Sequence, residues 1–206
     1  MPALDTLQLV SLAAALGWAS GIRLYLVLFV VGLVGYMGWY PLPAHLQLLA
    51  HPTVLIASGA MVAVEFVADK VPWFDSVWDA IHTFIRIPAG AALAAGVFGD
   101  SGAASAMAAA IIGGSLAAGS HVSKAGARAI ANTSPEPFSN WGLSLGEDVV
   151  VALGLLLALT QPWVFLALLL VLVLLMLWLL PKLWRAACGV LRRLKGTSVR
   201  PSPAAQ

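Results

Sequence analysis

Long apolar stretches follow one another along the chain, separated by short polar or proline-containing segments. The first two cover residues 7–19 and 24–39, and Ser20-Gly21-Ile22-Arg23 lies between them. At about 1.5 Å per residue, neither stretch comfortably crosses a hydrocarbon core of roughly 30 Å. The pattern therefore predicts two short helices, or one helix broken at Ser20-Gly21.

Prolines mark the ends of the next predicted elements. Residues 40–52 contain three prolines and two histidines but no Lys or Arg, which favours a loop on the outer side of a membrane. An apolar helix is predicted for 53–68. Pro72 ends this helix, and a short amphipathic helix is predicted from 74 to 86.

The segment after Pro88 is short and rich in small residues. Only about twelve residues separate Pro88 from Gly99-Asp100, too few to cross a bilayer, so we expect a re-entrant half-helix buried by protein. Between 88 and 119, 20 of 32 residues are Ala or Gly. Small residues allow helix backbones to approach closely in lipid, so this region should form the centre of the fold.

The second half of the chain repeats the alternation of apolar stretch and loop. The apolar residues 102–119 continue into 120–132 with polar positions at helical spacing, and 133–140 is predicted as a loop. Two apolar stretches, 145–160 and 163–180, follow. The last is almost entirely Leu, Val, Phe and Met, so we expect it to face lipid at the rim of the fold.

The composition agrees with an all-α, polytopic membrane bundle of short, broken or re-entrant helices. Of 206 residues, 61% are hydrophobic and only 10% are charged, whereas a soluble domain has about 25% charged residues. Six to eight helices would use nearly the whole chain. A weak similarity between Leu16–Ile22 and Leu116–Val122 raises the question of two structural repeats, although chance explains so few identities better.

The charges are unevenly distributed. Six of the eleven Lys and Arg residues follow position 181, where there is no acid, and the first 181 residues hold five basic and nine acidic residues. We therefore predict a transmembrane domain over 1–181 and a basic, partly disordered tail over 182–206. By the positive-inside rule the tail is cytoplasmic, which suggests a multi-pass protein of the plasma membrane. The short tail offers no aromatic residue after Trp184 that could stack on nucleic acid, so we expect no nucleic-acid partner.

Charged residues inside the predicted membrane region form two helical stripes of opposite sign. The first stripe comes after the acids Glu65 and Asp69 and their neighbour Lys70 in the sequence, and its members have the spacing i, i+4, i+7, i+11. The other has the spacing i, i+3, i+7, i+11. The stripes are Asp75, Asp79, His82 and Arg86, and His121, Lys124, Arg128 and Asn132.

Three further charges complete the candidate site. Arg23 is alone in the first apolar region, and Glu147-Asp148 follows Gly146 at the expected start of a helix, where acids suit the positive end of the helix dipole. Ionisable groups at membrane depth are costly and usually functional, so the stripes could line a polar central cavity. Two structural interpretations remain open: amphipathic helices at the membrane surface, or stripes that pair only to hold the bundle together.

The residues of the first stripe also carry a resemblance to a known family. Ser20-Gly-Ile-Arg23, the run from Glu65-Phe-Val-Ala-Asp-Lys70 through Asp75-Ser-Val-Trp-Asp79 to Pro88-Ala-Gly90, and Ser139-Asn-Trp with Glu147-Asp148 resemble a bacterial membrane family, domain of unknown function 4126. The resemblance covers roughly residues 8–175. It implies an integral membrane protein and brings no established activity or substrate.

The function that these features favour is a small transporter or channel. Broken helices and intramembrane acids suit a cation or proton, with His82 and His121 as proton relays, while Arg23 and the basic stripe could instead receive an anionic solute. The alternatives are a membrane scaffold that binds a partner through its basic tail and, with less support, a lipid-headgroup enzyme. In that enzyme Asp75, Asp79, Glu147 and Asp148 would be the candidate metal ligands. We expect no cofactor and no catalytic residues, lipid as the main partner, and leave a homo-oligomer open.

Overall fold

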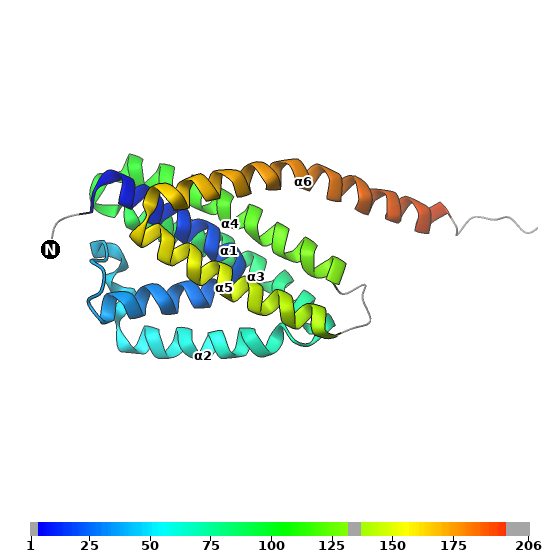
Figure 1. The fold of residues 1–206 in the computed structure, drawn as a ribbon, viewed down its shortest axis with the longest axis horizontal. Helices are drawn as coiled ribbons and strands as arrows, with labels where there is room; N and C mark the ends of the chain where they lie inside the picture. The colour runs from blue at the N-terminus through cyan, green and yellow to red at the C-terminus, as the bar shows by residue number, and fades with distance from the viewer. Residues whose placement is uncertain (1–3, 132–136, 197–206) are drawn as a thin grey trace, which may run out of the picture. The chain divides into compact units, whose positions relative to one another are not determined.

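The structure, a computed structural model, describes residues 4–131 and 137–196, and the described residues are helical apart from short connections. The α-helices are α1 (Thr6–Tyr36), α2 (Pro52–Ala68), α3 (Pro72–Val97), α4 (Ala103–Ala131), α5 (Pro137–Thr160) and α6 (Pro162–Gly196), and two short 3-10 helices are η1 (Ala44–Ala50) and η2 (Gly99–Ser101). The all-α class is thus confirmed (Figure 1). The chain divides into two units, residues 1–169 and 170–206, and the site lies in the first.

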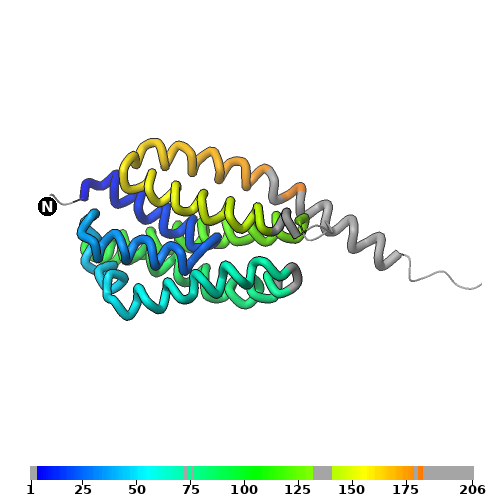
Figure 2. Tube along the Cα trace, turned by 60° about the horizontal axis from the view of Figure 1, so that its bottom comes forward, coloured from blue at the N-terminus to red at the C-terminus, as the bar shows by residue number. Residues whose placement is uncertain are grey.

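The first helix is broken at Arg23, close to the break that the sequence predicted at Ser20-Gly21. Arg23 has φ −142° and ψ 72°, which are not helical values, so α1 consists of two helical halves. The halves run in opposite directions, and the second returns toward the start of the first (Figures 1 and 2). Burial raises the pKa of the Tyr40 hydroxyl, and the negative charge of Asp5 raises it further, so the chain after the second half lies near the N-terminal cap of the first.

The break expected at Pro88 is wrong. One continuous helix, α3, runs from Pro72 to Val97 with Pro88 inside it. A proline in a helix removes one backbone hydrogen bond, and here the helix survives because α3 packs against both α1 and α4 along the Ala/Gly-rich region. The segment that the sequence assigned to a separate half-helix is therefore the second part of a full-length helix.

Two other predicted boundaries also shift. α5 begins at Pro137, so residues 137–140 are helical rather than part of a loop, and Glu147-Asp148 lies well inside α5 rather than in its first turn. In the second unit, α6 continues through Pro181 to Gly196, while residues 197–206 lie outside the described part of the chain. The domain boundary at 181 and the disorder of the tail stay predictions.

The small residues form the centre of the fold, as expected. A Cβ atom added to Gly17 would lie 2.6 Å from the Gly113 Cα, and one added to Gly113 would lie 2.3 Å from the Ala94 Cβ. The backbones of α1, α3 and α4 therefore cross at a distance that only small residues permit.

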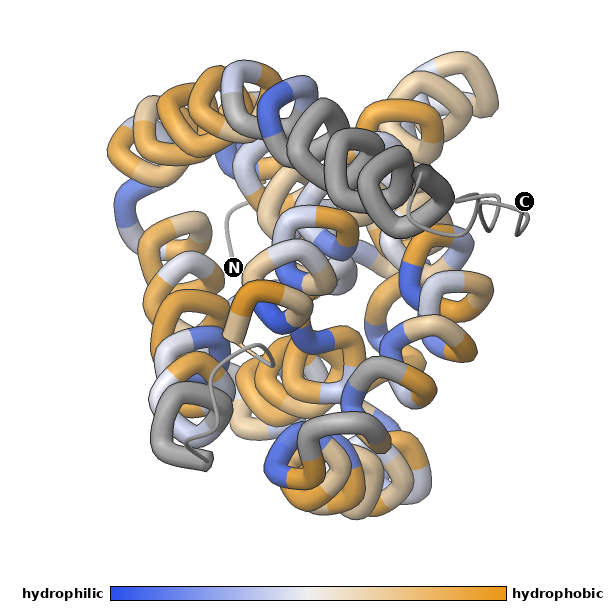
Figure 3. Tube along the Cα trace, turned by 90° about the vertical axis from the view of Figure 1, so that its right-hand side faces the viewer, coloured by the Kyte–Doolittle hydropathy of each residue, from blue (hydrophilic) through white to orange (hydrophobic). Residues whose placement is uncertain are grey.

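The exposed surface is apolar, as expected of a membrane protein. Phe84 is 82% exposed and Ile56 74% exposed, whereas Arg86 and Asp69 are completely buried, an arrangement opposite to that of a soluble protein. Hydrophobic residues cover most of each helix (Figure 3). Within the described chain, four helices are long and apolar enough to cross a bilayer by length and composition: Thr6–Tyr36, Val77–Val97, Ala103–Ala131 and Trp141–Thr160. The first of them is divided into two halves at Arg23, and η1 with α2, bent by 67°, would add one span. The protein is a multi-pass membrane protein.

Candidate functional site: a buried ion-pair network

Ten charged side chains from five helices meet inside the bundle, and we call them the ion-pair network. They comprise six acids and four bases, which leaves two formal negative charges in excess. The members are Arg23 of α1, Glu65 and Asp69 at the end of α2, Asp75, Asp79 and Arg86 of α3, Lys124 and Arg128 of α4, and Glu147 and Asp148 of α5. Both charged stripes therefore face inward and pair with each other, and the surface-helix interpretation is wrong.

Arg86 is the deepest cation of the network. Its guanidinium pairs with Glu65, and its Nη1 donates to Asp79 Oδ1 at 2.7 Å. Arg86 lies nine residues into the span Val77–Val97, which corresponds to about 14 Å and thus to the middle of a 30 Å core. Its Nε is buried and has no hydrogen-bond acceptor among the described residues.

Arg128 joins α4 to three other helices at the end of the bundle where α2 ends and α3 and α5 begin. Its Nη2 lies 2.9 Å from Glu147 Oε2 and 3.2 Å from Asp69 Oδ2. Its Nη1 donates to the Asp69 backbone carbonyl at 3.1 Å and lies 3.6 Å from Asp75 Oδ2. The network thus extends from this end of the bundle to the middle of the apolar span Val77–Val97.

Arg23 stands at the reversal of α1 and ties the tip of the hairpin to the network. Its guanidinium pairs with Asp69 through Nη1, its Nε lies 2.9 Å from Asp148 Oδ1, and its Nη2 lies 3.4 Å from Glu147 Oε2. Nη2 also donates to the hydroxyl of Ser144 at 2.8 Å and to its carbonyl at 3.0 Å. An arginine that reaches four partners fixes the tip within the bundle.

The break in α1 exposes backbone carbonyls to two residues of α4. A helix leaves the carbonyls of its last turn without internal partners. The carbonyl of Gly21 lies 3.3 Å from His121 Nδ1, and the carbonyl of Ile22 accepts from Lys124 Nζ at 3.1 Å. The negative end of the first half-helix therefore meets the basic stripe.

The two histidines of the stripes are hydrogen-bonded within the site. His82 Nδ1 lies 2.8 Å from the Trp78 carbonyl, which can only accept, so this nitrogen carries the proton and His82 Nε2 accepts from the Tyr25 hydroxyl at 3.1 Å. His121 Nδ1 lies 3.3 Å both from the Gly21 carbonyl, an acceptor, and from Arg86 Nη1, a donor. No single protonation state of His121 suits both neighbours, which is a property expected of a group that exchanges a proton.

Sequence reasoning missed three polar residues of the site. Ser144 binds Arg23, Tyr25 binds His82, and the Thr83 hydroxyl lies 2.7 Å from His121 Nε2. Ser144 precedes Glu147 by three positions and Thr83 follows Asp79 by four, so helical spacing places each near a residue that was identified. Tyr25 gave no such signal.

Lys70, a predicted site residue, makes no ion pair among the described residues. The Lys70 ammonium donates to the Phe66 carbonyl at 3.3 Å and lies over the Phe66 ring. Desolvation lowers the Lys70 pKa, Asp148 and Asp69 oppose this shift, and Arg23 adds to it. Asn132 lies outside the described residues.

The candidate metal ligands are separated by bases. Asp75 lies beside Arg128, Asp79 binds Arg86, and Glu147 and Asp148 bind arginines as well. Where the structure describes side chains, no three metal-ligating groups come together. The carboxylates are arranged as partners of fixed cations.

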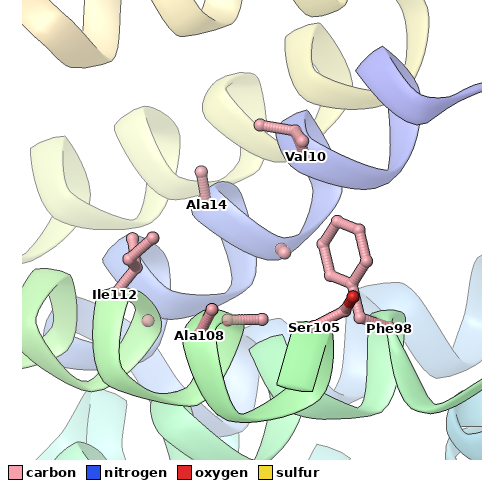
Figure 4. A pocket seen from close by; sticks show the side chains of 9 residues that line it. Val10, Ala14, Phe98, Ser105, Ala108 and Ile112 are labelled. Atoms are coloured by element: carbon pink, nitrogen blue, oxygen red, sulfur yellow. The ribbon is translucent and has the colours of Figure 1, made fainter. Parts of the chain in front are cut away.

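The other end of the α1 and α4 crossing holds an apolar cavity of about 260 Å³ (Figure 4). Its walls come from the beginning of α1, from Phe98 and from the beginning of α4. The lining residues are Val10, Ala13, Ala14, Phe98, Ser105, Ala108, Ala109, Ile112 and Gly113. The charged network and this apolar region thus occupy different parts of the same helices.

A family model described as "Domain of unknown function (DUF4126)" matches residues 10–182, which include the whole network. The chain belongs to this family. No curated protein and no solved structure matches the chain. Family membership confirms the resemblance on which the sequence analysis drew, and the chemistry of the site has to be argued from its own geometry.

Proposed function

We propose that this membrane protein is a secondary transporter that carries a proton or another small cation, with the ion-pair network as its binding site. The observation that carries the proposal is the position of the network. Charged side chains lie halfway along the apolar span Val77–Val97, and the network contacts the carbonyls at the break of α1 through His121 and Lys124. Many transporters bind their ions where a discontinuous helix exposes its carbonyls at half depth.

The energetic cost of the network argues for a function beyond holding the bundle together. Each charge at membrane depth costs at least about 2.5–3.5 kcal/mol on insertion scales. Buried ion pairs can often be replaced by apolar residues without loss of stability, so pairing alone is a weak reason to keep ten buried charged side chains. A transport cycle in which the charges exchange partners would be a functional reason to keep them.

The charge balance favours a cationic species. Six carboxylates face four bases, and every base has at least one carboxylate partner. An anionic solute would have to displace these carboxylates, whereas a proton or cation would compensate the excess negative charge. The two protonatable histidines at the same depth add groups that can carry a proton.

The arrangement of the helices supports an orientation in which the network opens to the cytoplasm of a bacterial cell. The start of α1, η1 and the connection from α3 to α4 lie at one end of the first unit (Figure 1). These segments contain no Lys or Arg, while Lys70 lies at the opposite end. By the positive-inside rule the first end is external, α1 is a re-entrant hairpin that enters from outside, and the basic tail is cytoplasmic.

Single cysteines would test this orientation. In a Cys188→Ala background, Gln47→Cys in η1 is expected to react with a membrane-impermeant maleimide in intact cells, because η1 lies at the external end. Val71→Cys, between α2 and α3, should react only after the cells are opened. The reverse pattern would mean that the network faces the external side. The exposed apolar surface supports lipid contact, and both the lipid partner and a homo-oligomer stay predictions.

Proton flux in proteoliposomes would test the transport proposal. The wild-type protein is expected to dissipate an imposed pH gradient, measured with a trapped pH-sensitive dye, faster than empty liposomes do. Asp79→Asn should reduce this flux by about tenfold or more, because Asp79 binds both Arg86 and Lys124 at the centre of the network.

Asp100→Asn is the matched control, since Asp100 is 70% exposed and lies in η2 away from the network. It should leave the flux unchanged. Equal flux in the wild type and in Asp79→Asn would remove the proposed role of the network. A wild type no faster than empty liposomes, with protons and with Na⁺ or K⁺ gradients, would contradict transport of small cations altogether.

A further inference from the structure

An apolar groove lies between α2 and α3, the two helices that residues 69–71 connect. Its volume is about 590 Å³, within the range of about 300–1,000 Å³ that is typical of small-molecule sites. Although α2 and α3 follow each other directly, they make few contacts with each other, because α2 packs mainly on α1 and α3 packs mainly on α4 and α1. The groove is lined by Ala63, Val64, Val67, Ala68, Val71 and Phe74.

The groove has the surface and the length of a site for one lipid acyl chain. All the residues that line it are apolar. The eight positions from Ala63 to Val71 correspond to about 12 Å at helical rise, and one leaflet contributes about 15 Å to a hydrocarbon core of roughly 30 Å. An acyl chain from one leaflet would therefore occupy most of the groove.

The ammonium of Lys70 lies next to the end of the groove at Val71. Its Nζ donates to the Phe66 carbonyl at 3.3 Å and lies 2.8 Å from the centre of the Phe66 ring and 5.5 Å from the centre of the Trp141 ring. Among the described residues it makes no ion pair, whereas every base of the ion-pair network has a carboxylate partner. Lys70 is therefore available to an anion from outside the protein.

The neighbours of Lys70 place its ammonium at the level of lipid headgroups. Trp141 begins the apolar span Trp141–Thr160, and Phe74 precedes the apolar span Val77–Val97 by three positions. Tryptophan and lysine at the end of an apolar span are typical of the membrane interface. A phosphate at this level would meet Lys70, and the chain attached to it would extend along the groove toward Ala63.

We propose that the groove between α2 and α3 binds one anionic glycerophospholipid, with an acyl chain against the valines of α2 and the phosphate on Lys70. The lipid comes from the leaflet that the proposed orientation makes cytoplasmic. This inference goes beyond the proposed transport function and does not depend on it, because lipid binding is measured without flux. The groove holds the chain, and the charge of Lys70 favours an anionic headgroup over a zwitterionic one.

The bound lipid would stabilise the connection between α2 and α3. Asp69 in this connection pairs with both Arg23 and Arg128, so a ligand that fixes the connection also fixes two of the ion pairs. A ligand that binds the folded protein and not the unfolded chain raises the stability by mass action. Lipid binding should therefore raise the melting temperature.

The headgroup is tested with the purified full-length protein in detergent, to which phosphatidylglycerol or phosphatidylcholine with the same acyl chains is added. The wild type is expected to retain one phosphatidylglycerol molecule in native mass spectrometry. Its melting temperature should rise by about 2–4 °C more with phosphatidylglycerol than with phosphatidylcholine. Lys70→Met should bind phosphatidylglycerol about fivefold more weakly, and Lys70→Arg should bind it as the wild type does. Without lipid the three proteins should melt at the same temperature.

The groove is tested with Ala63→Trp, because Ala63 lines the groove and a tryptophan at this position would fill it. This variant should retain neither lipid, although Lys70 is intact. Ala152→Trp is the matched control, since Ala152 is exposed on α5 and does not line the groove, and it should bind lipid as the wild type does. Val67→Trp, at a position that is 63% exposed, takes the place of Ala63→Trp if that variant does not fold.

Equal stabilisation of the wild type by both lipids, or equal binding of phosphatidylglycerol by the wild type and Lys70→Met, would overturn the anionic headgroup. Lipid retention by a folded Ala63→Trp equal to that of Ala152→Trp would overturn the groove as the binding site. A change from dimer to monomer in Ala63→Trp without loss of lipid would assign the groove to a second copy of the chain and refute the inference. The Lys70 variants decide the headgroup whether or not the tryptophan variants fold.

Discussion

Replacement of Arg86 by Met is expected to destabilise the protein by about 3–5 kcal/mol. Arg86 is completely buried and binds both Glu65 and Asp79, so its loss would leave two carboxylates in the interior without their main counter-charge. Removal of one partner of a buried ion pair destabilises a protein more than replacement of both partners by apolar residues, because the remaining charge is neither paired nor solvated. Thermal or denaturant unfolding in detergent would measure the change.

The double variant Arg86→Met with Glu65→Gln should recover part of this loss, because it removes one uncompensated charge together with the base. Lys70→Met is the matched control. Lys70 is partly exposed and has no ion pair in the described structure, so its replacement should change the unfolding free energy by less than about 0.5 kcal/mol. An Arg86→Met variant as stable as Lys70→Met would mean that Arg86 does not hold the network together.

Gly17→Val is expected to have the second large effect, about 3 kcal/mol or more of destabilisation. A Cβ atom at this position would lie 2.6 Å from the Gly113 Cα and 2.8 Å from its carbonyl oxygen, and backbone atoms cannot move aside as a flexible side chain can. The crossing of α1 and α4 would have to open. The variant should lose its helical signal at a lower temperature than the wild type does, and thermal unfolding would measure this difference.

Gly142→Ala provides the comparison, because a Cβ atom at Gly142 in α5 meets no atom within 4 Å. This variant should be neutral or slightly more stable, since alanine favours a helix by up to about 1 kcal/mol over glycine. Equal effects of the two substitutions would show that the close approach of α1 and α4 is not required.

The site was more predictable from the sequence than the arrangement of the helices that carry it. The spacing of Asp75, Asp79, His82 and Arg86 placed them on one helical face whatever the neighbours were, and the structure buries that face. Hydropathy alone could not decide whether Pro88 ends a helix, because the answer depends on packing of α3 against α1 and α4. In α3 the tertiary contacts outweigh the local tendency of Pro88 to end a helix.

The reversal at Arg23 shows a different limit. The sequence predicted a break near Ser20-Gly21, but a kinked span and a hairpin have the same hydropathy. What distinguishes them is the long-range pairing of Arg23 with Asp69 and Glu147, residues remote in the chain. Helical spacing identifies residues that share a face and does not indicate which helix that face will meet.

The three-residue connection between α2 and α3 has a mechanical consequence. Residues 69–71 join the two helices, and α3 begins at once with Pro72. So short a link does not let one helix slide along the other. The acids at this junction must therefore move together; they are Glu65, Asp69, Asp75 and Asp79. Any opening of the bundle that moves these acids away from Lys124 and Arg128 would break all their ion pairs with those bases in one step, so the protein should switch between two forms, with the pairs made or broken, rather than loosen gradually.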